Sequence, residues 1–320
     1  MSSIAKIVGC SLSTVSRALK HDQQISQEVA NRIELVAREL GYKVIKRPIN
    51  PLQNPKNQIK NICLFFPYDV VEYSLTALDT FVFNNISRWA QKAGIQIHII
   101  RLTEMGTLPG HITREWTNGF LMKSHQKPSL KKCPLLYNLP IVQMFAFAPN
   151  LDDDIQVSID VNQCISCIFE ELIPRKNYER IIVPIDETHL NHEICQKMAL
   201  LEASCKTLNL QLHRLPMDSK LLNSIQCLSR AQGDTLVILM RCHDTFENIL
   251  REQLKLIVPT CEVLMMTYDY KCSYDPTVHW LDMRGEDIVS LAWYNLLALI
   301  EKGYGVGANI LIRPQLHLAK

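Results

Sequence analysis

Residues 4–19 decide how the N-terminal part of the chain folds, and they read Ile4-Ala5-Lys6-Ile7-Val8-Gly9-Cys10-Ser11-Leu12-Ser13-Thr14-Val15-Ser16-Arg17-Ala18-Leu19. We predict one helix from about Ser3 to Val8 and a second from about Leu12 to Lys20, joined at Gly9, which tolerates a positive φ. Ala5 is small enough for the second helix to cross the first closely. This spacing is typical of a helix-turn-helix, and an ordinary three-helix bundle fits it too.

The predicted surface of the second helix carries groups that suit a nucleic acid. The residues expected on it are Leu12, Ser13, Thr14, Ser16 and Arg17. Hydroxyl groups can bind phosphates, and arginine suits the O6 and N7 atoms of guanine. A third helix is predicted to begin at Ser26, a suitable N-cap, and to end at Leu40, before Gly41.

Basic residues are concentrated at the start of the chain. Residues 1–60 contain ten Lys/Arg and four Asp/Glu, a net charge of +6. Residues 61–320 contain twenty-four Lys/Arg and twenty-eight Asp/Glu, a net charge of −4. This asymmetry favours a nucleic-acid contact through the N-terminal part. Residues 43–60 contain three prolines and five basic residues without an acidic one, which predicts a linker.

From residue 59 onwards, short apolar runs alternate with helical stretches. Strands are predicted at 62–66, 95–102, 119–122, 141–147, 157–159, 181–185, 210–215, 236–240, 263–266 and 278–281. Helices are predicted at 74–92, 162–173, 192–208, 219–231, 245–256 and 286–302. Such alternation indicates an α/β fold with parallel sheets, and the length suffices for two lobes with a ligand cleft between them.

Several classes of protein are disfavoured. Eleven cysteines form no disulfide framework, and no signal peptide precedes them, which indicates a reduced cytoplasmic protein. Cys164 and Cys167 have zinc-like spacing without further ligands, so no metal site is expected. The uncharged stretch 133–151 is broken by prolines, so no membrane span is expected. Because P-loop, GxGxxG, GxSxG and HExxH motifs are lacking, we expect no enzyme and no cofactor.

The N-terminal motif resembles that of a known family. Ser11-x-Ser-Thr-Val-Ser-Arg-Ala-Leu19, with Ile25-Ser26 and Arg38-Glu-Leu-Gly-Tyr42 after it, is similar to the start of the LacI/GalR repressors. The body resembles them in sparser motifs, at 157–160, 242–244, 258–269, 276–281 and 312–316. The resemblance implies a small all-α helix-turn-helix head and a two-lobed α/β core, like that of periplasmic binding proteins, with parallel sheets.

The resemblance also implies domain boundaries and partners. The head would span 1–43, a Pro-rich hinge 44–58, and an effector-binding, dimerising core 59–320. Lobe one would comprise about 59–160 and 282–305, and lobe two about 161–278 and 306–320. The sequence of the body is most similar in character to repressors of sugar-utilisation operons, which include galactosidase regulators. Such a homodimer would bind a near-palindromic double-stranded DNA operator, with an affinity that a small sugar-like effector changes.

Site residues follow from the same resemblance. DNA contacts are expected from Ser11, Leu12, Ser13, Thr14, Ser16, Arg17, Lys20, Ser26, Tyr42, Lys46, Arg47 and Leu52. Effector contacts are expected from Tyr68, Asp160, Gln196, Lys197, His243, Asp269 and Trp280, with the family's sugar-clamping arginine falling at either Gln196 or Lys197.

The hinge departs from the family's pattern. Members carry a short helix there that enters the minor groove, whereas this chain has Pro48 and Pro51. An extended hinge with Lys46 and Arg47 along the groove fits the sequence as well as a helix with Leu52 as the wedge.

The cleft departs as well. Neither Gln196 nor Lys197 replaces the planar donor of an arginine, and the family's acidic residue would fall near Phe145. A second hypothesis therefore stands beside the first. In it the chain binds DNA, but its core senses no small molecule and acts through a protein partner or constitutively.

Overall fold

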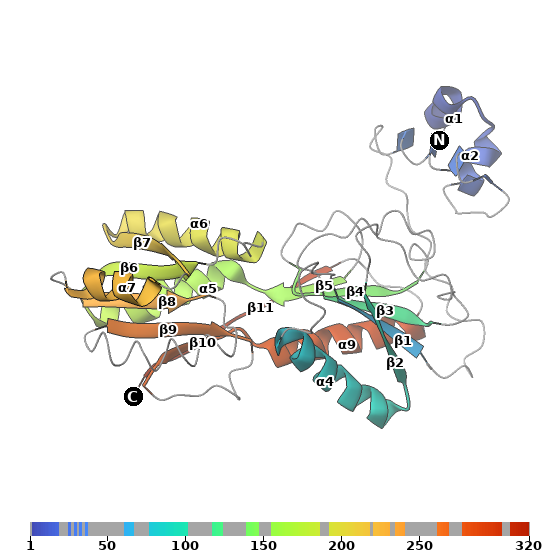
Figure 1. Ribbon diagram of the computed structural model, residues 1–320. Helices are drawn as coiled ribbons and strands as arrows, with labels where there is room; N and C mark the ends of the chain where they lie inside the picture. The colour runs from blue at the N-terminus through green and yellow to red at the C-terminus, as the bar shows by residue number, and fades with distance from the viewer. Residues whose placement is uncertain are drawn as a thin grey trace.

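The computed structural model describes a helical head and a body of two α/β lobes (Figure 1). The residues described are 2–18, 25–26, 29–30, 32–33, 36–37, 61–66, 77–101, 117–123, 139–146, 155–185, 192–217, 220–230, 234–240, 261–268, 277–302 and 308–319. The predicted hinge at 44–58 and the predicted helix at 245–256 lie outside them.

The head begins with the two predicted helices, α1 (Ser2–Val8) and α2 (Leu12–Ala18). Gly9 between them has a φ of +75°, a value that an L side chain rarely adopts. The third helix is represented by 29–30, 32–33 and 36–37, all helical. Its apolar face closes a small core against the first two helices, which includes Ile4, Ala5, Val15, Ala18, Ile33, Val36 and Ala37.

Lobe one is built on a parallel sheet in the order β11-β5-β4-β3-β1-β2. Its strands are β1 (Asn61–Phe66), β2 (Gln96–Arg101), β3 (Gly119–Lys123), β4 (Ile141–Met144), β5 (Ile155–Ile159) and β11 (Ala308–Ile312). Helices α4 (Ala77–Ala93) and α9 (Gly285–Lys302) pack against each other and the sheet (Figure 1). Alternate strand residues face these helices, which is why apolar runs appear where both sheet faces are covered.

Lobe two repeats the scheme with the order β12-β10-β9-β8-β6-β7. Its strands are β6 (Tyr178–Ile185), β7 (Gln211–Pro216), β8 (Asp234–Leu239), β9 (Cys261–Thr267), β10 (His279–Asp282) and β12 (Gln315–His317), and only β12 runs antiparallel among these. Helices α5 (Val161–Cys167) and α6 (His192–Thr207) contribute to the cluster on one face, and α7 (Leu221–Arg230) to that on the other. The predicted helix at 162–173 instead passes from α5 into a π-helical turn, Ile168–Leu172, and a 3₁₀ turn, Ile173–Arg175.

Within the described residues the chain crosses between the lobes at three places. The first crossover is Asp160, the second is Met283–Arg284, and the third is Arg313–Pro314. The Asp160 N–H donates to the Ile312 carbonyl at 2.8 Å, which ties the first crossover to the third.

The third crossover corrects one predicted boundary. Residues 306–320 are predicted to lie in lobe two, but β11 pairs with β5 in lobe one and only β12 joins lobe two. Neither strand was predicted, because each is short and its pairing partner lies far away in the sequence.

The hydrophobic cores also join the lobes. The largest cluster is continuous from Ile62 and Leu64 in lobe one to Ile181 and Leu236 in lobe two. None of the helices described is long and apolar enough to cross a membrane. Among the described residues there is no group of three or more His, Cys, Asp or Glu that could hold a metal ion.

Candidate functional site

The start of α2 is fixed by Ser11. Its Oγ accepts a hydrogen bond from the Thr14 N–H at 3.1 Å and lies 2.7 Å from the Ser13 Oγ and 2.8 Å from the Thr14 Oγ1. A serine cap of this kind satisfies an N–H group that the first helical turn leaves unpaired. Three predicted contact residues therefore share one hydroxyl cluster at the helix start.

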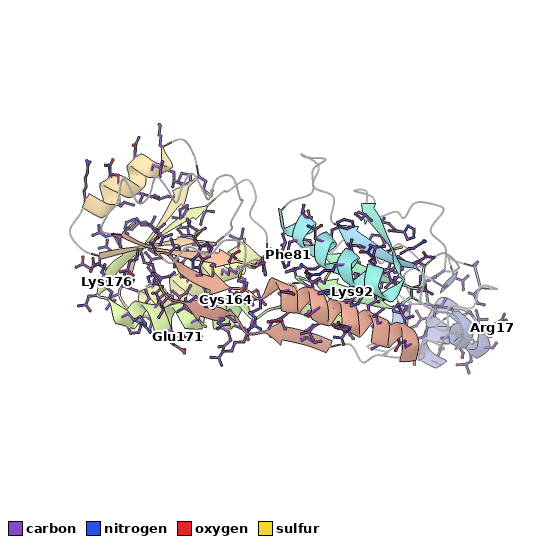
Figure 2. The ribbon with its side chains drawn as sticks, turned by 90° about the horizontal axis from the view of Figure 1, so that it is seen from below. Arg17, Phe81, Lys92, Cys164, Glu171 and Lys176 are labelled. Atoms are coloured by element: carbon purple, nitrogen blue, oxygen red, sulfur yellow. The ribbon has the colours of Figure 1, made fainter. Side chains whose placement is uncertain are left out.

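The remaining residues of α2 divide between surface and core. Leu12 is 56% exposed and Ser13 is exposed, while Val15 and Ala18 face the core of the head. Ser16 and Arg17 are partly exposed, and Figure 2 places Arg17 in the head, at the opposite end of the molecule from Lys176. An exposed leucine at a helix start offers an apolar surface to whatever the head binds.

The other predicted DNA contacts are only partly covered. Ser26 is exposed, and its carbonyl accepts the Ala30 N–H at 3.0 Å, so it stands at the start of the third helix. The predicted contacts at Lys20, Tyr42, Lys46, Arg47 and Leu52 lie outside the described residues.

The second candidate region lies where the lobes meet, on the side of lobe two that carries Cys164 (Figure 2). Asp160 ends β5 and caps α5, and its Oδ1 accepts the Gln163 N–H at 3.2 Å. It therefore has a structural role at the first crossover, alongside the predicted role in effector binding.

Lys197 is occupied by the protein's own groups. Its side chain on α6 is only 1% exposed and forms an ion pair with Glu193, one helical turn earlier. The Lys197 Nζ also lies 3.3 Å from the Met283 Sδ on the second crossover. The Glu193 Oε1 accepts a further hydrogen bond, 2.8 Å long, from the Tyr268 hydroxyl at the end of β9.

Phe145 and Tyr268 make an aromatic contact between the lobes. Phe145 directly follows β4 in lobe one, and its ring centroid lies 5.0 Å from that of Tyr268, at an interplanar angle of 84°. Phe145 is fully buried with a φ of +54°, a conformation that is uncommon for a bulky residue. A phenyl ring therefore stands where the family resemblance implies a carboxylate.

The surroundings of this network are buried, and burial shifts the pKa values of its groups. Burial raises the pKa of the Cys164 thiol to about 12, with Lys197 lowering it and Glu193 and Asp160 raising it further. Burial also raises the pKa of the Tyr268 hydroxyl well above its ordinary value, and Glu193 adds to that effect. At neutral pH Tyr268 is therefore a hydrogen-bond donor.

Lobe one has its own buried ion pair at the carboxyl edge of its sheet. Lys123, the last residue of β3, pairs with Asp79 in the first turn of α4, and both side chains are largely buried. Each lobe therefore has a buried lysine that is paired with a carboxylate of the same lobe. The pairs are Lys123–Asp79 in lobe one and Lys197–Glu193 in lobe two.

The predicted effector residues do not all come together. Trp280 on β10 is 1% exposed and belongs to the cluster on the α7 face of lobe two, a position that favours a core role over the predicted ring contact with an effector. Gln196 is partly exposed. The predicted contacts at Tyr68, His243 and Asp269 lie outside the described residues. Glu193 is not among the predicted site residues, although its spacing of four from Lys197 on a helix indicates that the two side chains are neighbours.

Comparisons with known proteins agree with this architecture. Residues 1–44 match the family model for bacterial regulatory proteins of the lacI family. No curated protein sequence matches the chain.

Solved structures resemble the chain over most of its length. A complex of the transcriptional regulator CelR with cellobiose has a TM-score of 0.60 at 13% identity, covering 98% of this chain and 97% of that one. The Lac repressor bound to ONPG in the repressed state has a TM-score of 0.59 at 13% identity, covering 98% and 96%. A periplasmic binding protein/LacI transcriptional regulator from Alkaliphilus metalliredigens, solved with D-xylulofuranose, has a TM-score of 0.59 at 13% identity. The match covers 81% of this chain and 97% of that one. At such identities the likeness is one of fold.

Proposed function

We propose that this chain, whose first 44 residues match the lacI family model and whose body shares the fold of solved LacI regulators, is a sequence-specific DNA-binding transcriptional repressor. The observation that carries the proposal is the head, in which a Ser11-capped α2 presents Leu12 and Ser13 outward from a buried core. The protein would act in the cytoplasm as a homodimer without enzymatic activity.

The head would read DNA through α2 in the major groove. Two heads related by the dimer's twofold axis would bind the two halves of a near-palindromic operator. The Ser11, Ser13, Thr14 and Ser16 hydroxyls would bind phosphates or base edges, Leu12 would contact a thymine methyl group, and Arg17 would bind guanine. Lys20, Ser26, Tyr42 and the basic hinge residues would extend the contact to the DNA backbone.

Arg17→Ala should weaken operator binding by about 1–3 kcal/mol, because a bidentate contact with guanine is lost. The measurement is fluorescence anisotropy of the full chain on a DNA duplex selected from a random library by the wild-type protein. Arg230→Ala is the matched control, since Arg230 is an exposed arginine in the last turn of α7. Equal affinity of the Arg17→Ala protein and the control would contradict the assigned role.

We propose that a small sugar-like effector binds between the lobes and changes operator affinity. CelR and the Alkaliphilus protein were solved with cellobiose and D-xylulofuranose, and both share this fold. Of the described residues, Asp160 and Gln196 are the partly exposed candidates for hydroxyl contacts. Tyr68, His243 and Asp269 complete the proposed set.

The alternative function, a DNA-binding regulator whose core senses no small molecule, is favoured by one observation. Lys197, the candidate at the sugar-clamping position, is buried and already paired with Glu193. Such a protein would act constitutively or through a protein partner.

Thermal unfolding of the full chain against mono- and disaccharides, sugar phosphates and purines separates the two functions. A sensor at one hundred times the Kd of its ligand gains about 2.7 kcal/mol of stability, so one chemical class should raise the Tm by several degrees. A Tm that stays constant across the whole panel would favour the alternative function.

A further inference from the structure

The polar network at the lobe junction joins the interior of lobe two to the second crossover. Tyr268 reaches Glu193 on α6 through its hydroxyl, at 2.8 Å. Through its backbone carbonyl the same residue accepts the Gly285 N–H at 3.2 Å, at the end of the second crossover. Tyr268 thus links the interior of lobe two to the crossover by two separate hydrogen bonds.

The second crossover fits tightly against Tyr268. A Cβ atom at Gly285 would lie 2.4 Å from the Tyr268 carbonyl oxygen, so only glycine permits this approach. Met283 is held from the other side, because its N–H donates to the Thr267 carbonyl at 2.8 Å and its sulfur contacts the Lys197 Nζ at 3.3 Å. The crossover is therefore packed against lobe two through both backbone and side chain.

Lobe one reaches the same residue through Phe145. Its positive φ is an unfavourable backbone conformation that only a well-determined surrounding maintains. Here the Phe145 N–H donates to the Val157 carbonyl at 2.8 Å, and its ring packs edge to face against Tyr268. The aromatic contact lies within the hydrophobic cluster that runs through both lobes.

We propose that the Phe145–Tyr268 contact is an interlobe latch, in which Glu193 and Lys197 hold Tyr268 in place, and that it keeps the lobes in one relative arrangement without a ligand. Because the ion pair is buried and the rings are closely packed, the latch is either engaged or broken rather than gradually stretched. Rotation of the lobes requires the Phe145 ring to leave the Tyr268 ring, and the hydrogen bond to Glu193 fixes the position of Tyr268. The consequence for the spacing of the DNA-binding heads rests on the proposed function, whereas the latch itself does not.

The test compares two hydroxyl deletions in the full chain by hydrogen exchange with mass spectrometry. Tyr268→Phe keeps the ring beside Phe145 and removes only the bond to Glu193. Tyr178→Phe is the matched control, because the Tyr178 hydroxyl also donates to a carboxylate, Glu262, next to Lys176. Figure 2 shows Lys176 at the far end of lobe two from Cys164.

We expect Tyr268→Phe to speed exchange of the Met283 and Gly285 amides about tenfold, as loss of a buried bond to a carboxylate predicts. Amides in β1 and β2 should exchange as in the wild type, and the control should leave the crossover amides unchanged. Wild-type exchange at both crossover amides, or equal acceleration throughout the chain, would overturn the latch.

Anisotropy on the selected operator distinguishes this proposal from the proposed function. An engaged latch predicts that Tyr268→Phe changes operator affinity while Tyr178→Phe does not. Failure of the wild-type protein to select any DNA sequence would refute the regulator and leave the exchange result standing. Unaltered affinity with faster crossover exchange would confirm the latch and remove its link to the heads.

Discussion

Replacement of Lys197 by methionine is expected to lower the free energy of unfolding by about 3–5 kcal/mol, although methionine matches lysine closely in length. The lysine side chain is 1% exposed, and its ion-pair partner, the Glu193 side chain, is 6% exposed. Removing the cation leaves a buried carboxylate without its counter-charge, and the cost of that uncompensated charge exceeds the gain from burying a thioether.

Urea unfolding of the full chain, followed by tryptophan fluorescence, measures this effect. Lys206→Met is the matched control, an exposed lysine in the last turn of the same helix, and it should change stability by less than about 0.5 kcal/mol. The double variant Lys197→Met/Glu193→Gln should recover much of the loss, because both charges are then absent. Equal midpoints for Lys197→Met and Lys206→Met would mean that Lys197 is solvated in solution.

Trp280→Ala is expected to cost about 3–5 kcal/mol of stability, because Trp280 fills the cluster between the sheet of lobe two and α7. The indole is 1% exposed, and its removal leaves a cavity bounded by residues such as Val237 and Met265. An indole that stacks on an effector would behave in the opposite way, with little change in stability and a loss of ligand binding.

The same urea titration distinguishes these outcomes. Tyr294→Ala provides the comparison, since Tyr294 is 60% exposed on α9 and contacts only Trp89 among the ring pairs described here. We expect a much smaller loss from it than from Trp280→Ala. A Trp280→Ala protein as stable as the wild type would restore the effector contact that the sequence predicted.

Local features were predictable wherever neighbouring residues determine them. Gly9 marks the turn between α1 and α2, and Val15 and Ala18 mark the buried side of α2, because helical spacing alone sets which residues share a face. The alternation of apolar runs and helices in 59–320 likewise predicted two lobes with mainly parallel sheets. The pairing of β11 and β12 could not be predicted, since short strands acquire their identity from partners, which here lie about 150 and about 35 residues away.

The sequence by itself determined that the chain begins with short helices joined at Gly9, with Leu12 and Ser13 on the outer face of the second, because that arrangement depends on short-range periodicity. The family resemblance named Gln196 or Lys197 as the residue at the sugar-clamping position. Only the tertiary structure decided that Lys197 is buried, because its surroundings include Glu193, Tyr268 and Met283, the last of them 86 residues further along the chain. The sheet order likewise decided that Trp280 faces α7, because successive residues of a strand point to opposite faces and the chain pattern does not say which helix covers each.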